Sequence, residues 1–109
     1  MSRAKGNIAE EKASEYLQSV GYSIVERNFY SRFGEIDIIA FKEEVFHFVE
    51  VKSADDYELA IQNITPTKLS RLIKTIHVYM KKNNLDVDFM LDAIVVTPNE
   101  ITLVENITL

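Results

Sequence analysis

Two adjacent apolar runs, separated by a short charged turn, constrain the fold of this chain more than any other feature. Residues 35–41 and 45–52 carry Ile, Val and Phe on alternating positions of both faces, and Lys42, Glu43 and Glu44 separate them. This pattern predicts an antiparallel hairpin. A hairpin that is apolar on both faces needs cover on each side, which a layered arrangement provides. We therefore expect an α/β fold.

Two helices are expected to supply this cover. Residues 7–20 place apolar side chains on one side at about 100° per residue, and Gly21 follows as a helix terminator. Thr65 and Pro66 are typical of a helix start, and the apolar spacing continues to about residue 82. The other segments are predicted to be strands at residues 22–29, 89–97 and 101–104, with an irregular stretch at residues 53–64.

The length of 109 residues predicts a single domain over residues 1–109, with a mixed sheet and a helix on each face. The chain has no cysteine, which excludes a disulfide framework and a thiolate zinc site and fits a reducing cytosol. Its first residues lack the apolar core of a signal peptide, and no apolar run is long enough to span a membrane. We therefore expect a cytoplasmic protein without a membrane partner.

The charge of the chain is unevenly distributed. The formal net charge is −5, yet residues 59–85 contain five basic residues and no acid, so the remainder carries −10. This predicts a basic helix on an acidic body. Lys68, Arg71 and Lys74 of that helix are candidates for phosphate contact, with an ordinary solvated helix face as the alternative.

The hairpin brings charged residues together inside apolar strands. If Phe41 pairs with Phe46, Asp37 lies opposite Glu50 and shares a face with Lys52. Two carboxylates held about 4.5 Å apart repel by roughly 3–4 kcal/mol at an effective dielectric constant near 20. Lys52 neutralises part of this repulsion, and a divalent cation would neutralise more. An oxygen-rich site of this kind suits Mg²⁺ or Mn²⁺.

Two further acids lie near this set in the predicted fold. On the first helix, Glu10 borders the apolar stripe while Glu11 points to solvent, which makes Glu10 the candidate third acid. Glu35 lies opposite Lys52 in the same register and is interpreted as its structural partner.

Several other polar and aromatic residues are interpreted as structural. Asp92 lies in an apolar strand and is expected to pair internally. The two histidines are interpreted as ordinary strand and helix residues, at His47 and His77. Three aromatic residues before Gly34 could stack on bases, but packing in the core or in a loop is favoured, at Phe29, Tyr30 and Phe33.

The chemistry that this set of residues suits is phosphodiester hydrolysis. That reaction needs an activated water and stabilisation of charge on the phosphoryl oxygens, and a metal ion held by Asp37 and Glu50 supplies both. Lys52 either orients or deprotonates the water, or stabilises the developing charge.

Asp37 followed by Glu50-Val51-Lys52 resembles the PD-(D/E)XK nuclease motif. A fuller pattern is similar to the YraN-like family of uncharacterised bacterial proteins. The matching blocks are Gly6-x-x-x-Glu10-x-x-Ala13, Gly21-Tyr22, Asn28, Gly34-Glu35-Ile36-Asp37-Ile38-Ile39-Ala40, Phe48-Val49-Glu50-Val51-Lys52, Lys68 and Leu91-Asp92-Ala93-Ile94-Val95-Val96.

The resemblance implies a restriction-endonuclease-like αβββαβ core and a metal-dependent endonuclease that uses Mg²⁺ or Mn²⁺. It gives site roles to Glu10, Asp37, Glu50 and Lys52, the three acids as metal ligands, with Lys68 as an accessory. The implied partner is nucleic acid, with DNA favoured over RNA, and a homodimer stays open because many nucleases act on two strands as dimers.

Two other interpretations stay open. The chain could be a nucleic-acid-binding module that keeps the fold without the activity, because Ala54 and Met90 stand where the family commonly has arginine. It could also be an interaction protein that uses the scaffold alone. Metal-dependent cleavage, salt-dependent binding and divalent metal binding distinguish the three.

Overall fold

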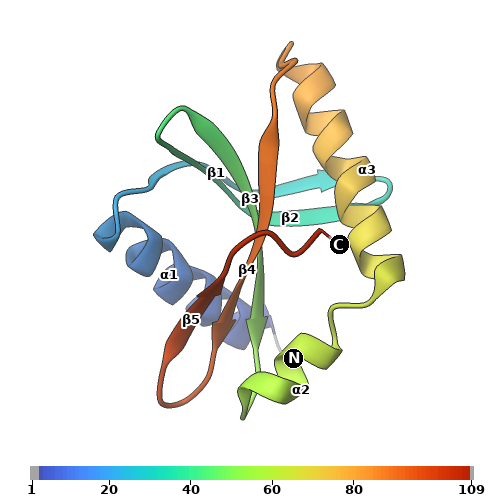
Figure 1. Ribbon diagram of the computed structural model, residues 1–109. Coiled ribbons are helices and arrows are strands. Elements are labelled where there is room, and N and C mark those ends of the chain that lie inside the picture. Colours follow the sequence, from blue (N-terminus) through green and yellow to red (C-terminus); the bar gives the residue numbers. More distant parts are fainter. Residues whose placement is uncertain (1–2, 109) are drawn as a thin grey trace.

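The computed structural model describes residues 3–108, with side chains from residue 8 onward (Figure 1). Its elements in chain order are α1 (Arg3–Ser19), β1 (Ser23–Ser31), β2 (Gly34–Lys42), β3 (Val45–Ser53), α2 (Tyr57–Gln62), α3 (Pro66–Lys82), β4 (Phe89–Val96) and β5 (Ile101–Val104). Thr65 caps α3 as predicted, since its hydroxyl accepts from the Lys68 amide. The expected α/β fold with a mixed sheet is confirmed.

The prediction of an irregular stretch over residues 53–64 is wrong for α2. This helix has six residues, too few for a clear apolar period, and tertiary packing of Ala60 contributes to its placement. Its start carries a local signal, because the Asp56 side chain accepts a hydrogen bond from the Leu59 amide as an N-cap.

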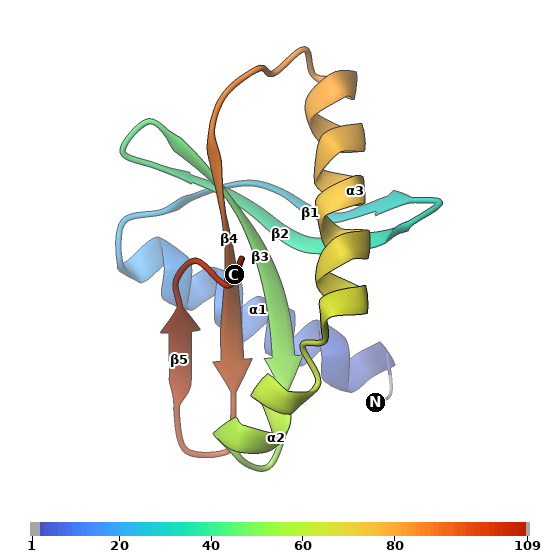
Figure 2. The same cartoon turned by 45° about the vertical axis from the view of Figure 1, so that its right-hand side comes forward.

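The five strands form one sheet in the order β1-β2-β3-β4-β5. β3 and β4 are parallel, while the other neighbouring strands are antiparallel. The segment from α2 through α3 makes the crossover that a parallel pair requires. Figure 2 shows that β1 and β2 run at a large angle to β3, β4 and β5, so the sheet is strongly bent.

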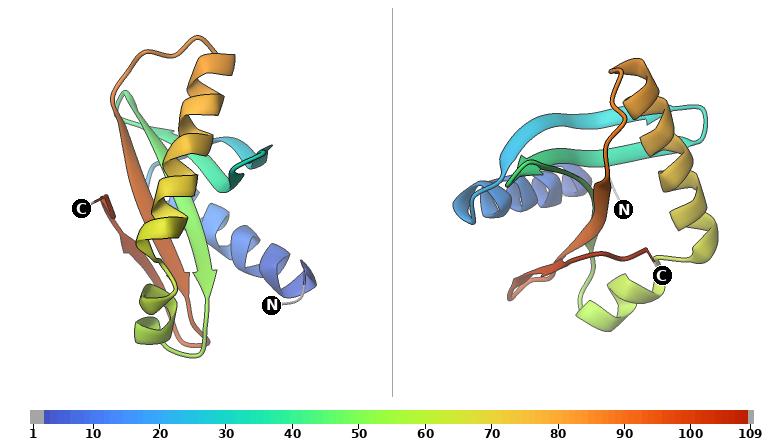
Figure 3. Two further views of the ribbon diagram at one scale, coloured as in Figure 1. Left: turned by 90° about the vertical axis from the view of Figure 1, so that its right-hand side faces the viewer. Right: turned by 45° about the horizontal axis from the view of Figure 1, so that its top comes forward.

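Each face of the sheet has its own core. On one face, α1 packs Ala9, Ala13 and Leu17 against aliphatic residues of β2, β3 and β4. On the other face, α3 packs Leu72 and Ile76 against a cluster that includes aromatic residues. The right-hand view of Figure 3 shows the sheet between α1 and α3. The expected helix on each face is thus confirmed.

The buried side of α1 is narrower than the sequence predicts. Ile8 and Val20 were expected on the apolar stripe, but they are 58% and 37% exposed. The contact is a line of residues spaced four apart, Ala9, Ala13 and Leu17, and the two larger residues lie beyond its reach. In the described part of the chain, no helix is long and apolar enough to cross a membrane.

Candidate functional site

The candidate site lies where β2 separates from β3. The two strands pair from Lys42–Val45 to Ile38–Val49, with Phe41 opposite Phe46 as predicted. The pairing ends there, so the expected direct opposition of Asp37 and Glu50 is not part of the ladder.

Glu35 lies beyond the end of the β2–β3 ladder, which stops at Ile38 and Val49, so its expected position opposite Lys52 is not part of the ladder either. The physical reason is the bend of the sheet, which turns the start of β2 away from the end of β3 (Figure 2). The residues that the hairpin was expected to pair therefore lie beyond the end of the β2–β3 ladder.

The Asp37 side chain joins β2 to β3 beyond the end of the ladder. Its Oδ2 accepts a hydrogen bond of 2.8 Å from the Val51 amide, so a side chain takes the place of a backbone acceptor. The residue is only 8% exposed. Burial, followed by a hydrogen bond with Glu50 and the Glu50 charge, raises the pKa of Asp37 to about 8, against the lowering effects of the Val51 amide and Lys52. The neutral form of the Asp37 carboxyl is thus favoured at this place.

Glu10 and Glu35 complete a cluster with Asp37, in which carboxylate oxygens of the three residues lie within 4.8 Å of one another. The Glu10 side chain is 13% exposed and the Glu11 side chain 59%, which confirms that Glu10 is the acid directed toward the sheet. Burial, and then the charges of Asp37 and Glu35, raise the pKa of Glu10 above its ordinary value, while Arg27 opposes this.

A break in strand alternation at Asp37 brings these acids together. Ile36 packs in the core on the α3 side, whereas Ile38 packs in the core on the α1 side. Residues two apart in a regular strand share a face, so the pleat is interrupted between them. Asn28, across from this point on β1, has a φ of 57°, a conformation that asparagine tolerates well. The paired irregularity directs Asp37 sideways toward β3.

Glu50 and Lys52 reach the cluster from the other face. Val49 and Val51 lie in the core on the α1 side, so the intervening Glu50, and Lys52 after it, leave β3 on the face of Phe48. Asp37 is directed between the two strands at the break in the pleat, and Glu50 and Lys52 both act on its pKa there.

Sequence reasoning missed Glu35 as a member of the acid cluster. It was assigned to Lys52 from an ideal hairpin register, and that register does not extend past Ile38. The available signal was its place on β2, only two residues before Asp37.

The other interpreted residues lie outside this cluster. Asp92 is fully buried and accepts from His47 Nδ1 at 2.8 Å and from the Asn106 amide at 2.8 Å, which confirms its internal pairing. His77 is exposed on α3 and lies edge-on to Phe89. The three candidate phosphate contacts are exposed on α3, at Lys68, Arg71 and Lys74.

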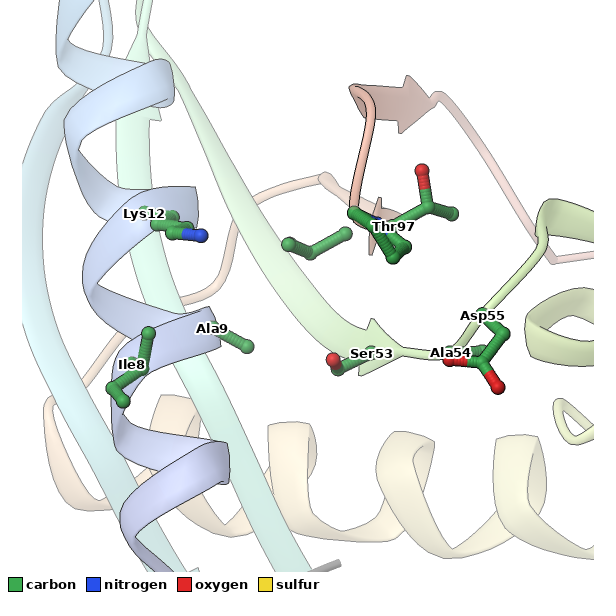
Figure 4. A pocket seen from close by; sticks show the side chains of 9 residues that line it. Ile8, Ala9, Lys12, Ser53, Ala54, Asp55 and Thr97 are labelled. Carbon is green, nitrogen blue, oxygen red and sulfur yellow. The ribbon is translucent and has the colours of Figure 1, made fainter.

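A separate hollow of about 180 Å³ opens between α1 and the ends of β3 and β4 (Figure 4). Ile8, Ala9 and Lys12 face Ser53 and Thr97 across it. The acids Glu10, Asp37 and Glu50 do not line it. The hollow is therefore a neighbour of the acid cluster and not the cluster itself.

The donor set of the acid cluster suits a hard divalent cation. Glu10, Glu35 and Asp37 offer carboxylate oxygens, and Glu50 contacts Asp37 from the other side. Oxygen ligands of this kind are preferred by Mg²⁺ and Mn²⁺. The raised pKa values of Glu10 and Asp37 have the same origin, since negative charge is concentrated in a buried place where a cation would relieve it.

Comparison with known proteins identifies the family of this chain. The chain belongs to the uncharacterised protein family UPF0102, whose family profile matches residues 9–96. The family named from the sequence motifs is thereby confirmed.

Similar proteins cover the chain from end to end. A UPF0102 protein of Sulfurimonas denitrificans is 72% identical over 109 residues, covering 100% of both chains. One from Aliarcobacter butzleri is 50% identical over 110 residues, also covering 100% of both. One from Helicobacter pylori is 51% identical over 106 residues, covering 97% of this chain and 92% of its own. These names state a family and no activity.

Proposed function

We propose that this member of UPF0102 is a metal-dependent endonuclease that hydrolyses phosphodiester bonds of nucleic acid, DNA in preference to RNA. The observation that carries the proposal is the convergence on Asp37 of Glu10, Glu35 and Glu50, with Lys52 close enough to lower the pKa of Asp37. A purely structural role would leave these acids repelling one another around Asp37, which is only 8% exposed.

The arrangement supports membership of the PD-(D/E)XK superfamily with its restriction-endonuclease-like core. The element order α1-β1-β2-β3-α3-β4 matches the αβββαβ order expected for that core, with α2 inserted before α3. Asp37 comes from β2, and Glu50 and Lys52 come from β3, as the motif requires.

Asp37, Glu10 and Glu50 would hold the Mg²⁺ or Mn²⁺ ion. When bound, the ion supplies Lewis-acid stabilisation of the phosphoryl oxygens and lowers the pKa of a bound water. The chain's own residues do the positioning. The Val51 amide fixes the Asp37 carboxylate by a hydrogen bond of 2.8 Å. Lys52 either stabilises charge on the phosphate as an ammonium group, or orients the water and, as a neutral amine, accepts its proton.

Glu35 is a further oxygen ligand in this proposal. One of its carboxylate oxygens lies within 4.8 Å of oxygens of Asp37 and Glu10. A site with four nearby carboxylates can hold one ion tightly or two ions at close range, and two-ion sites stabilise both the attacking and the leaving oxygen.

The test is cleavage by the purified chain of duplex, single-stranded and branched DNA and of RNA, each with Mg²⁺ or Mn²⁺ and with EDTA. We expect metal-dependent cleavage of a DNA substrate that Asp37→Asn abolishes. The matched control is Glu15→Gln, which changes an exposed acid of α1 outside the cluster. No cleavage of any of these substrates by the wild-type chain would refute the proposal.

A calorimetric Mn²⁺ titration tests the metal site independently of the substrate. We expect wild type and Glu15→Gln to bind equally, and Glu50→Gln and Glu10→Gln to bind at least about tenfold more weakly. Equal binding by all four proteins would place the metal elsewhere.

A second candidate function is nucleic-acid binding without hydrolysis. It is favoured by Ala54 and Met90, which stand where the family commonly has arginine, so the chain lacks two cations while it keeps the fold. This candidate predicts salt-dependent binding with no cleavage in any metal.

A further inference from the structure

The turn between β1 and β2 is connected to the middle of α3 by a hydrogen bond. Ser31 Oγ lies 2.9 Å from the hydroxyl of Thr75, a buried residue of α3, and also accepts from the Phe33 amide at 3.0 Å. The turn residues Arg32 and Phe33 lie between Ser31 and Gly34, which face each other in the strand pairing. The turn is therefore held in one position.

Two cations converge on the aromatic ring at this turn. The guanidinium carbon of Arg32 lies 4.8 Å from the centre of the Phe33 ring, and Lys74 Nζ lies 5.6 Å from the same centre. Arg32 and Lys74 are exposed, and Phe33 is partly exposed. Contact with a ring offsets little of the repulsion between two like charges at the surface. An anion such as a phosphate would offset more.

This surface continues along α3 in one direction and toward the acid cluster in the other. Lys74, Arg71 and Lys68 follow one another at intervals of three residues, so each is a neighbour of the next on the helix. Asp37 follows Phe33 by four residues, roughly 13 Å along an extended strand. In Figure 2 the turn projects beyond α3 on the side of the molecule where α1 begins.

We infer that Arg32, Phe33 and Lys74 form a docking surface for a single-stranded segment of nucleic acid that leads to the acid cluster. The inference rests on the proposed function and names its substrate class. An aromatic ring can accept a base only when that base is not stacked within a duplex, whereas the cations contact phosphates of any strand. Single strands, overhangs and branched molecules with unpaired bases present such a segment.

The surface distinguishes single strands from duplexes but not DNA from RNA. A protein tells RNA from DNA by hydrogen bonds to the 2′-hydroxyl. The Ser31 hydroxyl is committed to Thr75 and to the Phe33 amide, so the turn presents a ring and two cations to a ligand. We expect single-stranded DNA and RNA of one sequence to bind within a few-fold of each other.

The experiment measures binding in EDTA with Asp37→Asn, which cannot cleave if the proposed function is right. The probe is a single-stranded DNA oligonucleotide that contains the fluorescent base 2-aminopurine, compared with its duplex and with the RNA form. We expect quenching of the base on binding. Adding Phe33→Leu should remove the quenching and weaken single-strand binding by roughly 5- to 100-fold while changing duplex binding less than about twofold.

Two further variants control for loss of structure. Phe33→Tyr keeps the ring and should keep both quenching and affinity. His77→Gln changes an exposed ring of α3 that faces Phe89 and not the turn, and should bind like its parent. Thermal melting of each variant establishes that it is folded.

Equal loss of single-strand and duplex binding in Phe33→Leu would overturn the inference, and so would unchanged binding, absence of any binding, or a strong preference for either DNA or RNA. The outcome is separable from that of the proposed function. Phe33-dependent binding without metal-dependent cleavage by the wild type refutes the nuclease and supports the docking surface. Metal-dependent cleavage by the wild type, together with binding that does not depend on Phe33, supports the nuclease and refutes the docking surface.

Discussion

The Asp37 carboxylate accepts the hydrogen bond of the Val51 amide at 2.8 Å, at the point where β2 leaves β3. A side chain of β2 thereby supplies the acceptor for a backbone N–H of β3 beyond the end of the β2–β3 ladder. Loss of this acceptor leaves the amide of a buried residue unpaired, because Val51 is only 7% exposed.

Two substitutions at Asp37 are therefore expected to distinguish the effect of its charge on stability from the effect of its hydrogen bond. Asp37→Asn keeps an oxygen for the Val51 amide and removes the buried charge, so the metal-free variant should be more stable than wild type near pH 8. Asp37→Ala loses the acceptor and should be less stable than Asp37→Asn by about 1–3 kcal/mol. Urea unfolding in EDTA measures both. If the two variants have equal stability, the hydrogen bond is not important.

The pH dependence of stability follows from the raised pKa of Asp37. The value in the folded chain is about 8, above the ordinary value of 3.8. Between these values the folded chain holds a proton that the unfolded chain has released, so its contribution is complete below about pH 4 and is lost as the pH rises toward about 8. Glu10 shifts in the same direction.

We therefore expect the free energy of unfolding of the metal-free chain to fall between about pH 5 and about pH 8 more steeply in wild type than in Asp37→Asn. Parallel curves for the two proteins would show that Asp37 titrates normally.

Metal binding should reverse this trend. Deprotonated carboxylates are the ligands, so the increase in melting temperature caused by Mn²⁺ should grow as the pH rises from about 6 to about 8. The increase should be smaller in Glu35→Gln, because Glu35 contributes an oxygen to the cluster. Glu15→Gln is the matched control on the surface of α1 and should behave as wild type. An equal increase in Glu35→Gln would remove Glu35 from the ligand set.

Asp92 should be important for stability and not for the metal site. It accepts hydrogen bonds from His47 Nδ1 and from the Asn106 amide, and it is fully buried. Asp92→Ala leaves both donors without an acceptor and should lower the free energy of unfolding by roughly 2–4 kcal/mol. Asp88→Ala changes an exposed acid just before β4 and should cost less than about 0.5 kcal/mol. Mn²⁺ affinity of folded Asp92→Ala should match wild type.

The link between Ser31 and Thr75 can be measured by a double-mutant cycle. Their hydroxyl oxygens lie 2.9 Å apart, and Thr75 also donates to the Arg71 carbonyl oxygen at 3.0 Å. Ser31→Ala and Thr75→Val should show a coupling energy of about 1 kcal/mol in urea unfolding. A coupling energy near zero would mean that the turn is not fastened to α3 through this contact.

The sequence predicts the layers of this fold well because its apolar patterns are long. The hairpin of β2 and β3 follows from alternation, and α3 follows from Thr65 and its apolar period. The register at Phe41 and Phe46 was assumed, and the structure has it. The short helix α2 was not predicted because six residues give no clear apolar period, and only its N-cap at Asp56 was informative.

The candidate site was predictable in its members and less so in its geometry. Asp37, Glu50 and Glu10 were identified because charges in apolar strands, or beside an apolar stripe, stand out. Glu35 was misassigned because an ideal hairpin was extended beyond Ile38. The parting of the strands and the interrupted pleat at Asp37 depend on the bend of the whole sheet, which local patterns do not encode.

The parallel pairing of β3 with β4 has a consequence for how the chain folds. The β2–β3 hairpin joins neighbouring segments, whereas β4 can reach β3 only after the intervening residues 54–88 have been arranged, so this contact forms across a long loop. Substitutions in β4 should mainly slow refolding if that pairing limits the rate. β3, which carries Glu50 and Lys52, would then be held on both sides only after the last step of folding.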